Sequence, residues 1–328
     1  MKYAKDTRPK GVANKAAEVL VEALPWIKNI TGKTVVIKYG GSAMVDEQLR
    51  ADVMNDIVLL KIVGVNPVIV HGGGKAITEA MDFLQLPVEF KDGQRVTTPE
   101  AMDLVRTVLM GKVNQELVEA LNEHGNFAVG VSGADAGVIV AEQASPELGR
   151  VGRITRINSP LLDDLVAGDY IPVVASVALG EDGGFYNVNA DMVAGHIAAA
   201  IGAHKVVFLT DVDGLYENFE NKDSLISNLT LFEAQYMVEN NIVSTGMIPK
   251  LKSCIHALDS GVFRAHIING ITPHSLLLEL LTSTGVGTTM HSTEESCAFD
   301  THPLGNFASK LLENRQHAAG TTPNTKGY

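Results

Sequence analysis

Short runs of consecutive apolar residues recur along the chain, and each leads into glycines or polar turn residues. These runs predict buried strands over residues 34–39, 67–70, 171–175, 205–210 and 265–269. The apolar residues mostly occupy successive positions instead of alternating with polar ones, which is typical of strands covered on both faces in a parallel sheet. Helical patterns lie between several of these runs, so we expect right-handed β–α–β units.

Other segments have apolar residues at the spacing of an amphipathic helix. They are residues 12–30, 100–124, 191–201 and 249–260. Pro25 lies inside the first segment and is expected to kink or interrupt that helix. Between residues 134 and 158, Val and Ile are separated by turn residues, and we expect hairpins there. The order of these elements predicts an α/β fold.

Composition narrows the class of protein. A chain of 328 residues with 45% hydrophobic residues can form one large α/β unit or two closely joined halves. The net charge of −12 argues against nucleic acid and anionic membranes as partners. The two cysteines match no metal-ligand spacing, residues 1–11 do not form a signal peptide, and no apolar run is long enough to span a bilayer. We therefore expect a cytoplasmic protein.

Lys38 lies near the end of a predicted buried strand and is followed closely by Gly40 and Gly41. A lysine in this position costs free energy unless its charge is used. The glycines let the backbone approach a ligand and present N–H groups, so the motif is suited to phosphate oxygens. The alternative is a lysine that reaches solvent before a tight turn.

A second motif, His71-Gly72-Gly73-Gly74, follows a predicted strand and opens a predicted helix. Three glycines followed by the positive end of a helix dipole have the geometry of an anion site. The motif is neither the Gly-x-Gly-x-x-Gly dinucleotide fingerprint nor a Walker A loop. The alternative is a tight strand-to-helix turn, although three consecutive glycines exceed what such a turn needs.

Polar side chains occur at the ends of other predicted elements. Asn187 and Asn189 point the same way if the segment is extended, and two carboxamides suit a carboxylate or an amide. Asp191 could orient lysines or a metal, but Asn189 and Asp191 also suit ordinary helix capping. Asp211 follows a strand and fits nucleotide or metal contact, with an Asx-turn as the alternative.

Two cationic residues are further candidates. Lys250 follows Pro249 in the first turn of a predicted helix, where a positive charge opposes the helix dipole unless it is paired or functional. Arg95 lies in a short predicted loop. It could be an ordinary surface residue, or its guanidinium could bind a carboxylate in a bidentate manner.

The order of the motifs points to a family. They are KYGGSAM, VIVHGGG, GQRVT, GVSGADAG, NVNAD, LTDVDG and TGMIPK. Each is weak alone, but in this order and spacing they make the chain resemble the N-acetylglutamate kinases of the amino-acid-kinase superfamily, over about residues 34–289. The resemblance implies an open αβα sandwich with a mainly parallel central sheet. It also implies that residues 32–182 bind N-acetyl-L-glutamate and that residues 183–290 bind ATP with Mg²⁺.

The resemblance implies an activity and roles for individual residues. The activity is ATP-dependent phosphorylation of the γ-carboxylate of N-acetyl-L-glutamate, the second step of arginine biosynthesis. The catalytic residues would be Lys38 and Lys250, with Asp191 holding both lysines. The substrate site would comprise Gly73, Gly74, Arg95, Asn187 and Asn189. The nucleotide site would comprise Gly40, Gly41, Asp211, Gly246 and Lys250. Mg²⁺ would be bound mainly through the nucleotide, and no metal ligands from the chain are expected.

Regulation is implied as well. The helix within residues 1–31 resembles the extra helix through which arginine-inhibited members assemble into hexamers, and the alternative is a helix packed on its own domain. His266, Glu279 and Gly285 fall where those members bind L-arginine, and a carboxylate suits a guanidinium. Residues 291–328 extend past the usual end of the family, and we expect a disordered tail there.

Other functions remain possible from the sequence alone. The chain could phosphorylate another substrate of the superfamily, such as glutamate, aspartate, carbamate or uridylate. It could also be a non-catalytic arginine sensor on the same fold, although lysines at both catalytic positions argue against that. A dinucleotide oxidoreductase is a distant alternative because the fingerprint is missing.

Overall fold

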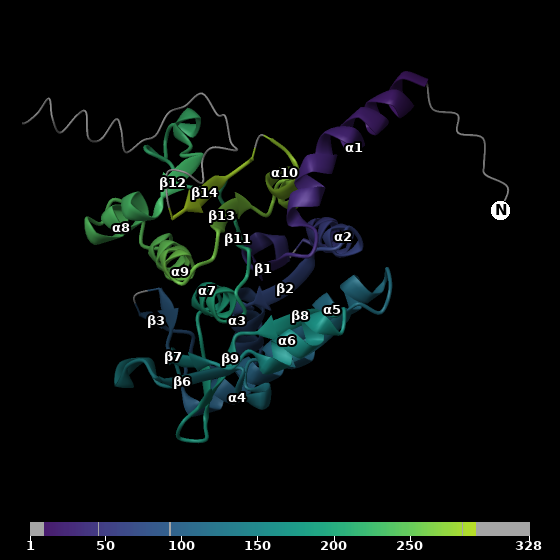
Figure 1. The fold of residues 1–328 in the computed structure, drawn as a ribbon. Helices are drawn as coiled ribbons and strands as arrows, with labels where there is room; N and C mark the ends of the chain where they lie inside the picture. The colour runs from purple at the N-terminus through teal and green to yellow at the C-terminus, as the bar shows by residue number, and fades with distance from the viewer. Residues whose placement is uncertain (1–9, 45, 92, 284, 293–328) are drawn as a thin grey trace, which may run out of the picture.

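A computed structural model of the chain describes residues 10–44, 46–91, 93–283 and 285–292. Figure 1 shows how its helices and strands are arranged. The strands are β1 (Thr34–Tyr39), β2 (Asn66–His71), β3 (Phe90–Lys91), β4 (Gln94–Arg95), β5 (Ala128–Ser132), β6 (Ile139–Gln143), β7 (Gly152–Ile157), β8 (Ile171–Ala175), β9 (Val177–Gly180), β10 (Phe185–Asn187), β11 (Lys205–Thr210), β12 (Asn228–Thr230), β13 (Arg264–Asn269) and β14 (Thr288–His291). The α-helices are α1 (Lys10–Ile30), α2 (Glu47–Ile62), α3 (Gly74–Phe83), α4 (Pro99–Val108), α5 (Gln115–Asn122), α6 (Pro160–Ala167), α7 (Ala190–Ala200), α8 (Leu231–Glu239), α9 (Ile248–Asp259) and α10 (Ser275–Leu281). Four short 3-10 helices are η1 (Gly41–Met44), η3 (Asp135–Gly137), η4 (Pro146–Leu148) and η5 (Lys222–Ser224), and η2 (Leu109–Asn114) is a π-helix that joins α4 to α5.

The central sheet is mainly parallel, as predicted. Among the described residues it has eight strands, in the order β12-β14-β13-β11-β1-β2-β8-β5. β1 lies in the middle and pairs in parallel with β2 and β11, whereas β13 and β14 are antiparallel. The predicted bounds of β1, β8 and β11 match the structure, and β2 and β13 are slightly longer than predicted. The carboxyl ends of β1, β2 and β11 therefore meet at one edge.

Side chains of the central strands alternate between two hydrophobic cores. In β1, Val35, Ile37 and Tyr39 belong to one core, and Val36 belongs to the other. The first core includes buried residues of α2, α3, α4, α5 and α10, and the second includes those of α6, α7, α8 and α9. Because helices cover both faces, successive positions of the strands are apolar. The predicted αβα sandwich is confirmed (Figure 1).

A smaller sheet packs beside the sandwich, with the strand order β10-β9-β6-β7. The antiparallel pair β6–β7 confirms the hairpin predicted between residues 134 and 158. β9 and β10 form a second hairpin, and its turn contains the expected boundary between residues 182 and 183. β3 and β4 form a separate two-stranded hairpin.

The helices and the end of the described chain differ from prediction in three places. Pro25 does not interrupt α1, which continues to Ile30 with Trp26 and Ile27 packed against the core, so a kink at Pro25 is the part of that expectation that stays a prediction. The predicted helix over residues 100–124 contains the π-helical turns of η2. Regular structure does not stop at residue 290, because His291 pairs with Arg264 within the sheet. The rest of the expected tail, residues 293–328, lies outside the described residues, as do residues 1–9. No helix in the described part of the chain combines the length and the apolar character needed to cross a membrane.

Candidate functional site

The side chains of Lys38 and Lys250 meet at one carboxylate. Asp191 Oδ1 lies 3.0 Å from Lys38 Nζ, and Asp191 Oδ2 lies 3.1 Å from Lys250 Nζ. Lys38 is near the end of β1, Asp191 is in the first turn of α7, and Lys250 is in the first turn of α9. The structure thus brings together the three residues that were expected to be catalytic.

The Asp191 carboxylate is buried, with 6% of the residue exposed. Burial by itself raises the pKa of Asp191, but the charges and hydrogen bonds of Lys38 and Lys250 outweigh it and hold the pKa below its ordinary value. The carboxylate therefore stays ionised between two ammonium groups. This cluster has an excess of positive charge, which suits it to an anionic ligand.

Local structure explains why α7 and α9 present these side chains to each other. Asn189 caps α7, and its side chain accepts hydrogen bonds from the N–H groups of Asp191 and Met192 at 2.8 and 3.3 Å. The helices approach closely at Gly195, where a Cβ atom would lie 2.3 Å from Ser253 Oγ. Ser253 Oγ also donates to the Asp191 carbonyl at 2.5 Å. Only a residue without a side chain permits this approach at position 195.

A cavity of about 220 Å³ lies beside Lys38 and Asp191. Its lining includes all the residues expected to bind the substrate, which are Gly73, Gly74, Arg95, Asn187 and Asn189. Glycine backbone, carboxamides and a guanidinium are all groups that can donate hydrogen bonds to carboxylate or amide oxygens. The cavity is therefore equipped for a small acidic molecule.

Arg95 is held against the wall of this smaller cavity. Its Nη2 donates to the Gly74 carbonyl at 2.9 Å and to Thr78 Oγ1 at 2.5 Å. Its guanidinium lies over the ring of Phe90, 4.7 Å from the ring centre. The residue is only 7% exposed, so it is not the surface arginine that was the alternative interpretation.

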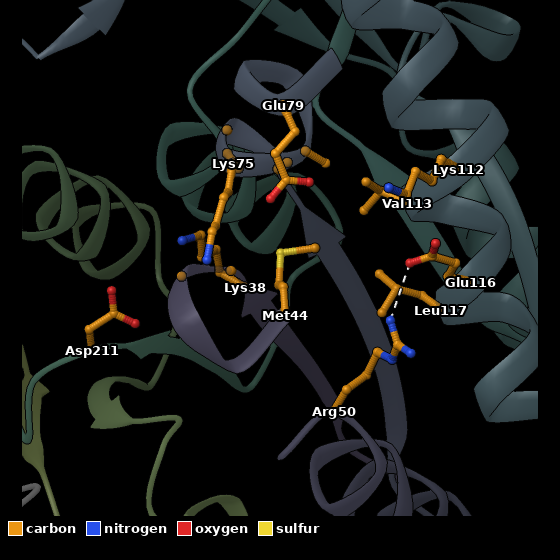
Figure 2. Close-up of a pocket in the computed structure, with 17 residues that line it drawn as sticks. Lys38, Met44, Arg50, Lys75, Glu79, Lys112, Val113, Glu116, Leu117 and Asp211 are labelled. Atoms are coloured by element: carbon orange, nitrogen blue, oxygen red, sulfur yellow. Dashed lines mark hydrogen bonds and ion pairs between the residues drawn. The ribbon is translucent and has the colours of Figure 1, made fainter. Parts of the chain in front are cut away.

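A larger cavity of about 560 Å³ shares Lys38 and the segment 72–74 with the smaller one. Gly40, Gly41 and Asp211 line it, as expected for the nucleotide residues, and Figure 2 shows Asp211 on the opposite side of Lys38 from Glu116. Gly41 has a φ of +76°, and a Cβ atom there would lie 2.4 Å from Asp211 Oδ1. Glycine is required at this position for both reasons.

Several charged residues of this larger cavity were not identified from the sequence. They are Arg50, Lys75, Glu79, Lys112 and Glu116. In Figure 2, Lys75 points toward the same part of the cavity as Lys38. Lys75 lies in the first turn of α3, so the helix-dipole argument that singled out Lys250 could have found it. Arg50 and Glu116 form an ion pair of 3.2 Å between α2 and α5, which only the tertiary structure shows.

Two of the expected nucleotide residues do not line either cavity. Gly246 lies in the turn before α9, and a Cβ atom there would meet nothing within 4 Å. Lys250 reaches the site through its ion pair with Asp191. The structure therefore gives Lys250 a partner in the cluster but places Gly246 outside the lining of both cavities.

The residues expected to bind arginine come together in a third, smaller cavity of about 50 Å³, which Trp26 of α1 also lines. Glu279 Oε1 lies 2.7 Å from His266 Nδ1, and Glu279 Oε2 accepts from the Val286 N–H at 2.8 Å. Burial by itself raises the pKa of Glu279, but these hydrogen bonds and the His266 ring lower it to about 2. Gly285 packs against the same carboxylate, since a Cβ atom there would lie 2.7 Å from Oε2.

The geometry allows one kind of chemistry in particular. Two cavities, one suited to a small acid and one bordered by a glycine turn and an aspartate, meet at Lys38, which Asp191 links to Lys250. Cations and backbone N–H groups at such a junction can stabilise a phosphoryl group as it passes between two oxygens.

Comparisons with known proteins agree with this geometry. The amino acid kinase family model matches residues 33–269. An acetylglutamate kinase of Caldanaerobacter subterraneus subsp. tengcongensis is 51% identical over 274 residues, which are 83% of this chain and 92% of that protein. An acetylglutamate kinase of Halothermothrix orenii is 48% identical over 277 residues, covering 83% of this chain and 96% of that protein.

A solved structure has the same fold at lower identity. N-acetylglutamate synthase from Neisseria gonorrhoeae, complexed with coenzyme A and N-acetyl-glutamate, superposes with a TM-score of 0.74 at 23% identity. The match covers 84% of this chain and 63% of that one, so it is a likeness of fold. The family match spans both cavities and all three residues of the Lys38–Asp191–Lys250 cluster, and the chain belongs to the amino acid kinase family.

Proposed function

We propose that the chain transfers the γ-phosphoryl group of ATP to the γ-carboxylate of N-acetyl-L-glutamate, forming N-acetyl-L-glutamyl 5-phosphate in the second step of arginine biosynthesis. The observation that carries this proposal is that Lys38, which Asp191 links to Lys250, lines both cavities where they meet. The names of the curated relatives support the choice of acceptor.

The reaction brings one anion to another, and this determines what the site must do. The nucleophile is a carboxylate that is already ionised near neutral pH, so no general base is needed. The barrier comes from repulsion and from positioning. Lys38 and Lys250 would neutralise the charge of the transferring group from two sides, while Asp191 keeps both ammonium groups at fixed positions.

The smaller cavity would hold the acceptor. Arg95 would clamp the α-carboxylate through the N–H groups that it does not use on the cavity wall. Asn187 and Asn189 would contact the acetamido and carboxylate groups, and the N–H groups of Gly73 and Gly74 would hold the γ-carboxylate. Its volume of about 220 Å³ is suited to a molecule of this size.

The larger cavity would hold the phosphates of ATP, beside Gly40 and Gly41. Mg²⁺ prefers phosphate and water oxygens together with one or two carboxylates. Asp211, whose carboxylate lies directly against Gly41 and lines this cavity, is suited to that role beside the nucleotide. The ion would neutralise phosphate charge during the transfer.

An acceptor panel tests this function. ADP release from ATP and Mg²⁺ is measured with N-acetyl-L-glutamate, L-glutamate and L-aspartate. We expect N-acetyl-L-glutamate to give the highest kcat/KM, and a Lys250→Ala variant to lower kcat on the order of 10²-fold or more. Equal or faster turnover with L-glutamate or L-aspartate would refute the choice of acceptor, and wild-type turnover by Lys250→Ala would refute the role of the lysine.

We also propose that L-arginine inhibits the enzyme at the third cavity. The ionised Glu279 carboxylate lies there beside Trp26, and it could exchange its present donors for a guanidinium. A cavity of about 50 Å³ must open to admit an amino acid. In the same ADP assay, arginine should inhibit the wild type, and Glu279→Gln should weaken inhibition at least about tenfold. Glu233 is also buried, so Glu233→Gln is the matched control and should leave arginine inhibition unchanged. Wild-type kinetics that do not change with millimolar arginine would contradict the proposal.

Assembly into a homohexamer in the cytoplasm completes the proposal. α1 extends away from the body in Figure 1, and Val19, Leu20, Val21 and Leu24 on it are each more than half exposed. Burial of such a surface in a second copy would stabilise an oligomer. Light scattering should give a mass near six times 35.0 kDa, reduced in a Leu20→Glu, Leu24→Glu double variant but not in Phe232→Glu. A monomeric wild type would exclude this assembly.

A further inference from the structure

His71 lies directly before the glycine segment and is completely buried. Its Nδ1 is 2.9 Å from the carbonyl oxygen of Gly72, and its Nε2 is 3.0 Å from Asn114 Nδ2. Asn114 Nδ2 also donates to the Val173 carbonyl of β8 at 2.8 Å. The ring therefore connects the glycine segment to the central sheet through one asparagine.

These contacts determine where the ring carries its proton. A carbonyl oxygen can only accept, so His71 Nδ1 must carry the hydrogen and donate to Gly72. Asn114 Nδ2 is identified as a donor by the Val173 carbonyl, so His71 Nε2 must accept from it. Both constraints specify the same neutral tautomer. Burial also lowers the pKa of His71 to about 4, which keeps the ring neutral near pH 7.

The hydrogen bond to Gly72 also orients the next peptide group. No peptide bond in the described residues is cis, and in a trans peptide the C=O and N–H groups point in opposite directions. Holding the Gly72 oxygen against the His71 ring therefore turns the Gly73 N–H away from the ring. Among the described residues this N–H has no hydrogen-bond partner, and Gly73 lines both cavities.

The π-helix η2, which includes Asn114, also packs directly against Gly73. A Cβ atom at Gly73 would lie 2.7 Å from Leu109 Cδ2 and 3.2 Å from Val113 Cγ2, both of η2. Asn114, which ends η2, contacts both His71 of β2 and the Val173 carbonyl of the neighbouring strand β8. π-Helical turns are rare and often occur at functional sites. Here the π-helix places Leu109 and Val113 against Gly73 and Asn114 against His71.

We propose that His71 and Asn114 are positioning residues that aim the Gly73 N–H at the phosphoryl group or acceptor carboxylate during transfer. This inference rests on the proposed function, because the Gly73 N–H is one of the oxyanion donors in that function, and His71 and Asn114 are inferred to position it. His71 and Asn114 should therefore affect catalysis mainly in the transition state, where the Gly73 N–H binds the charge on the oxygens most tightly. Neither residue touches substrate.

Two substitutions of His71 test the proposal. His71→Leu removes the donor to Gly72, whereas His71→Asn keeps an amide nitrogen near the position of Nδ1. We expect His71→Leu to lower kcat about 10²-fold with KM values changed less than about threefold, which is the loss typical of one oxyanion donor. His71→Asn should recover most of that loss. His204→Leu, which removes a partly buried histidine remote from both cavities, controls for lost stability and should keep the wild-type kcat.

The outcomes separate this inference from the proposed function. No turnover of N-acetyl-L-glutamate by the wild type would refute the proposed function. A folded His71→Leu variant with a kcat within about threefold of an active wild type would refute the inference, since a lost donor costs about 10²-fold. Equal losses in His71→Leu and His71→Asn would also overturn it, because they would indicate packing alone.

A second measurement keeps the proposal testable if His71→Leu does not fold. Neutron diffraction from crystals of the wild-type chain locates hydrogens on the imidazole. We expect hydrogen on His71 Nδ1 and none on Nε2. The opposite tautomer, or a doubly protonated ring near pH 7, would exclude the hydrogen bond on which the orientation of Gly73 depends.

Discussion

Replacing Asp191 with asparagine tests the cluster most sharply. The change keeps the shape of the side chain but removes the negative charge from between two ammonium groups at 3.0 and 3.1 Å. Each ammonium–carboxylate attraction is about 4 kcal/mol at 4 Å with an effective dielectric constant near 20. Desolvation offsets much of this, and removing one partner of a buried pair typically costs about 3–5 kcal/mol.

The net effect on stability should be near the lower end of that range. The two lysine side chains are 11% and 18% exposed and can relax toward solvent. We therefore expect Asp191→Asn to lower the free energy of unfolding by about 3 kcal/mol. At roughly 2 °C per kcal/mol for a chain larger than 150 residues, the melting temperature should fall by about 6 °C.

The effect on catalysis should be larger than the effect on stability. Both lysines lose the group that fixes their position, so kcat should fall on the order of 10²-fold or more, while the KM for N-acetyl-L-glutamate changes little. Steady-state kinetics of ADP release and differential scanning calorimetry measure the two effects on the same samples.

Asp182→Asn is the matched control. Asp182 is also ion-paired, 2.6 Å from Arg150 Nη1, but its side chain is 47% exposed. A surface pair of this kind contributes at most about 1 kcal/mol, and it lies outside both cavities. The reasoning is refuted if Asp191→Asn keeps wild-type kcat, or if both variants lose the same stability and activity.

Further predictions concern a glycine and pH. Gly41 and Gly183 have nearly equal φ values of +76° and +77°, but only at Gly41 would a Cβ meet a carboxylate, that of Asp211. Both alanine variants should lose about 1–2 kcal/mol of stability because of backbone strain. Only Gly41→Ala should lower kcat, by about 10-fold or more, because the added methyl group displaces Asp211 in the site. Equal kcat values in the two variants would contradict this prediction. For His71, burial lowers the pKa from 6.5 to about 4, so between these pH values the unfolded chain binds a proton that the folded chain does not. Stability should therefore fall with acid, by up to about 3 kcal/mol from this residue. Urea unfolding from pH 7 to pH 4 should show a shallower decline for His71→Asn, and an unchanged slope would exclude this origin.

The sequence predicts the parallel sheet well because its strands are buried on both faces. β1, β8 and β11 each contain a central run of successive apolar residues with polar or turn residues around it, so their positions follow closely from the pattern. Lys250 could be singled out because a positive charge in the first turn of a helix needs a compensating partner. The structure supplies that partner in Asp191, 59 residues away in the chain.

Other parts of the site depend on tertiary structure. The π-helical turn of η2 leaves no signature in apolar spacing, so the role of Asn114 beside His71 could not be predicted. From the sequence, Arg50 of α2 and Lys112 of η2 look like ordinary residues on the exposed faces of helices. Only the packing of α2 and η2 beside the larger cavity gives them a place in it. β3 and β4 have two residues each, which is too short for a recognisable pattern of apolar residues. The segment that contains them was nevertheless singled out because of Arg95.

The central claim is that the γ-carboxylate of N-acetyl-L-glutamate becomes the phosphoryl acceptor. Hydroxylamine converts an acyl phosphate into a stable hydroxamate, which mass spectrometry identifies. The wild-type chain with ATP, Mg²⁺, N-acetyl-L-glutamate and hydroxylamine should form N-acetyl-glutamyl hydroxamate in step with ADP, and Lys250→Ala should form almost none. ADP release without hydroxamate, or hydroxamate formed equally without ATP, would contradict the account.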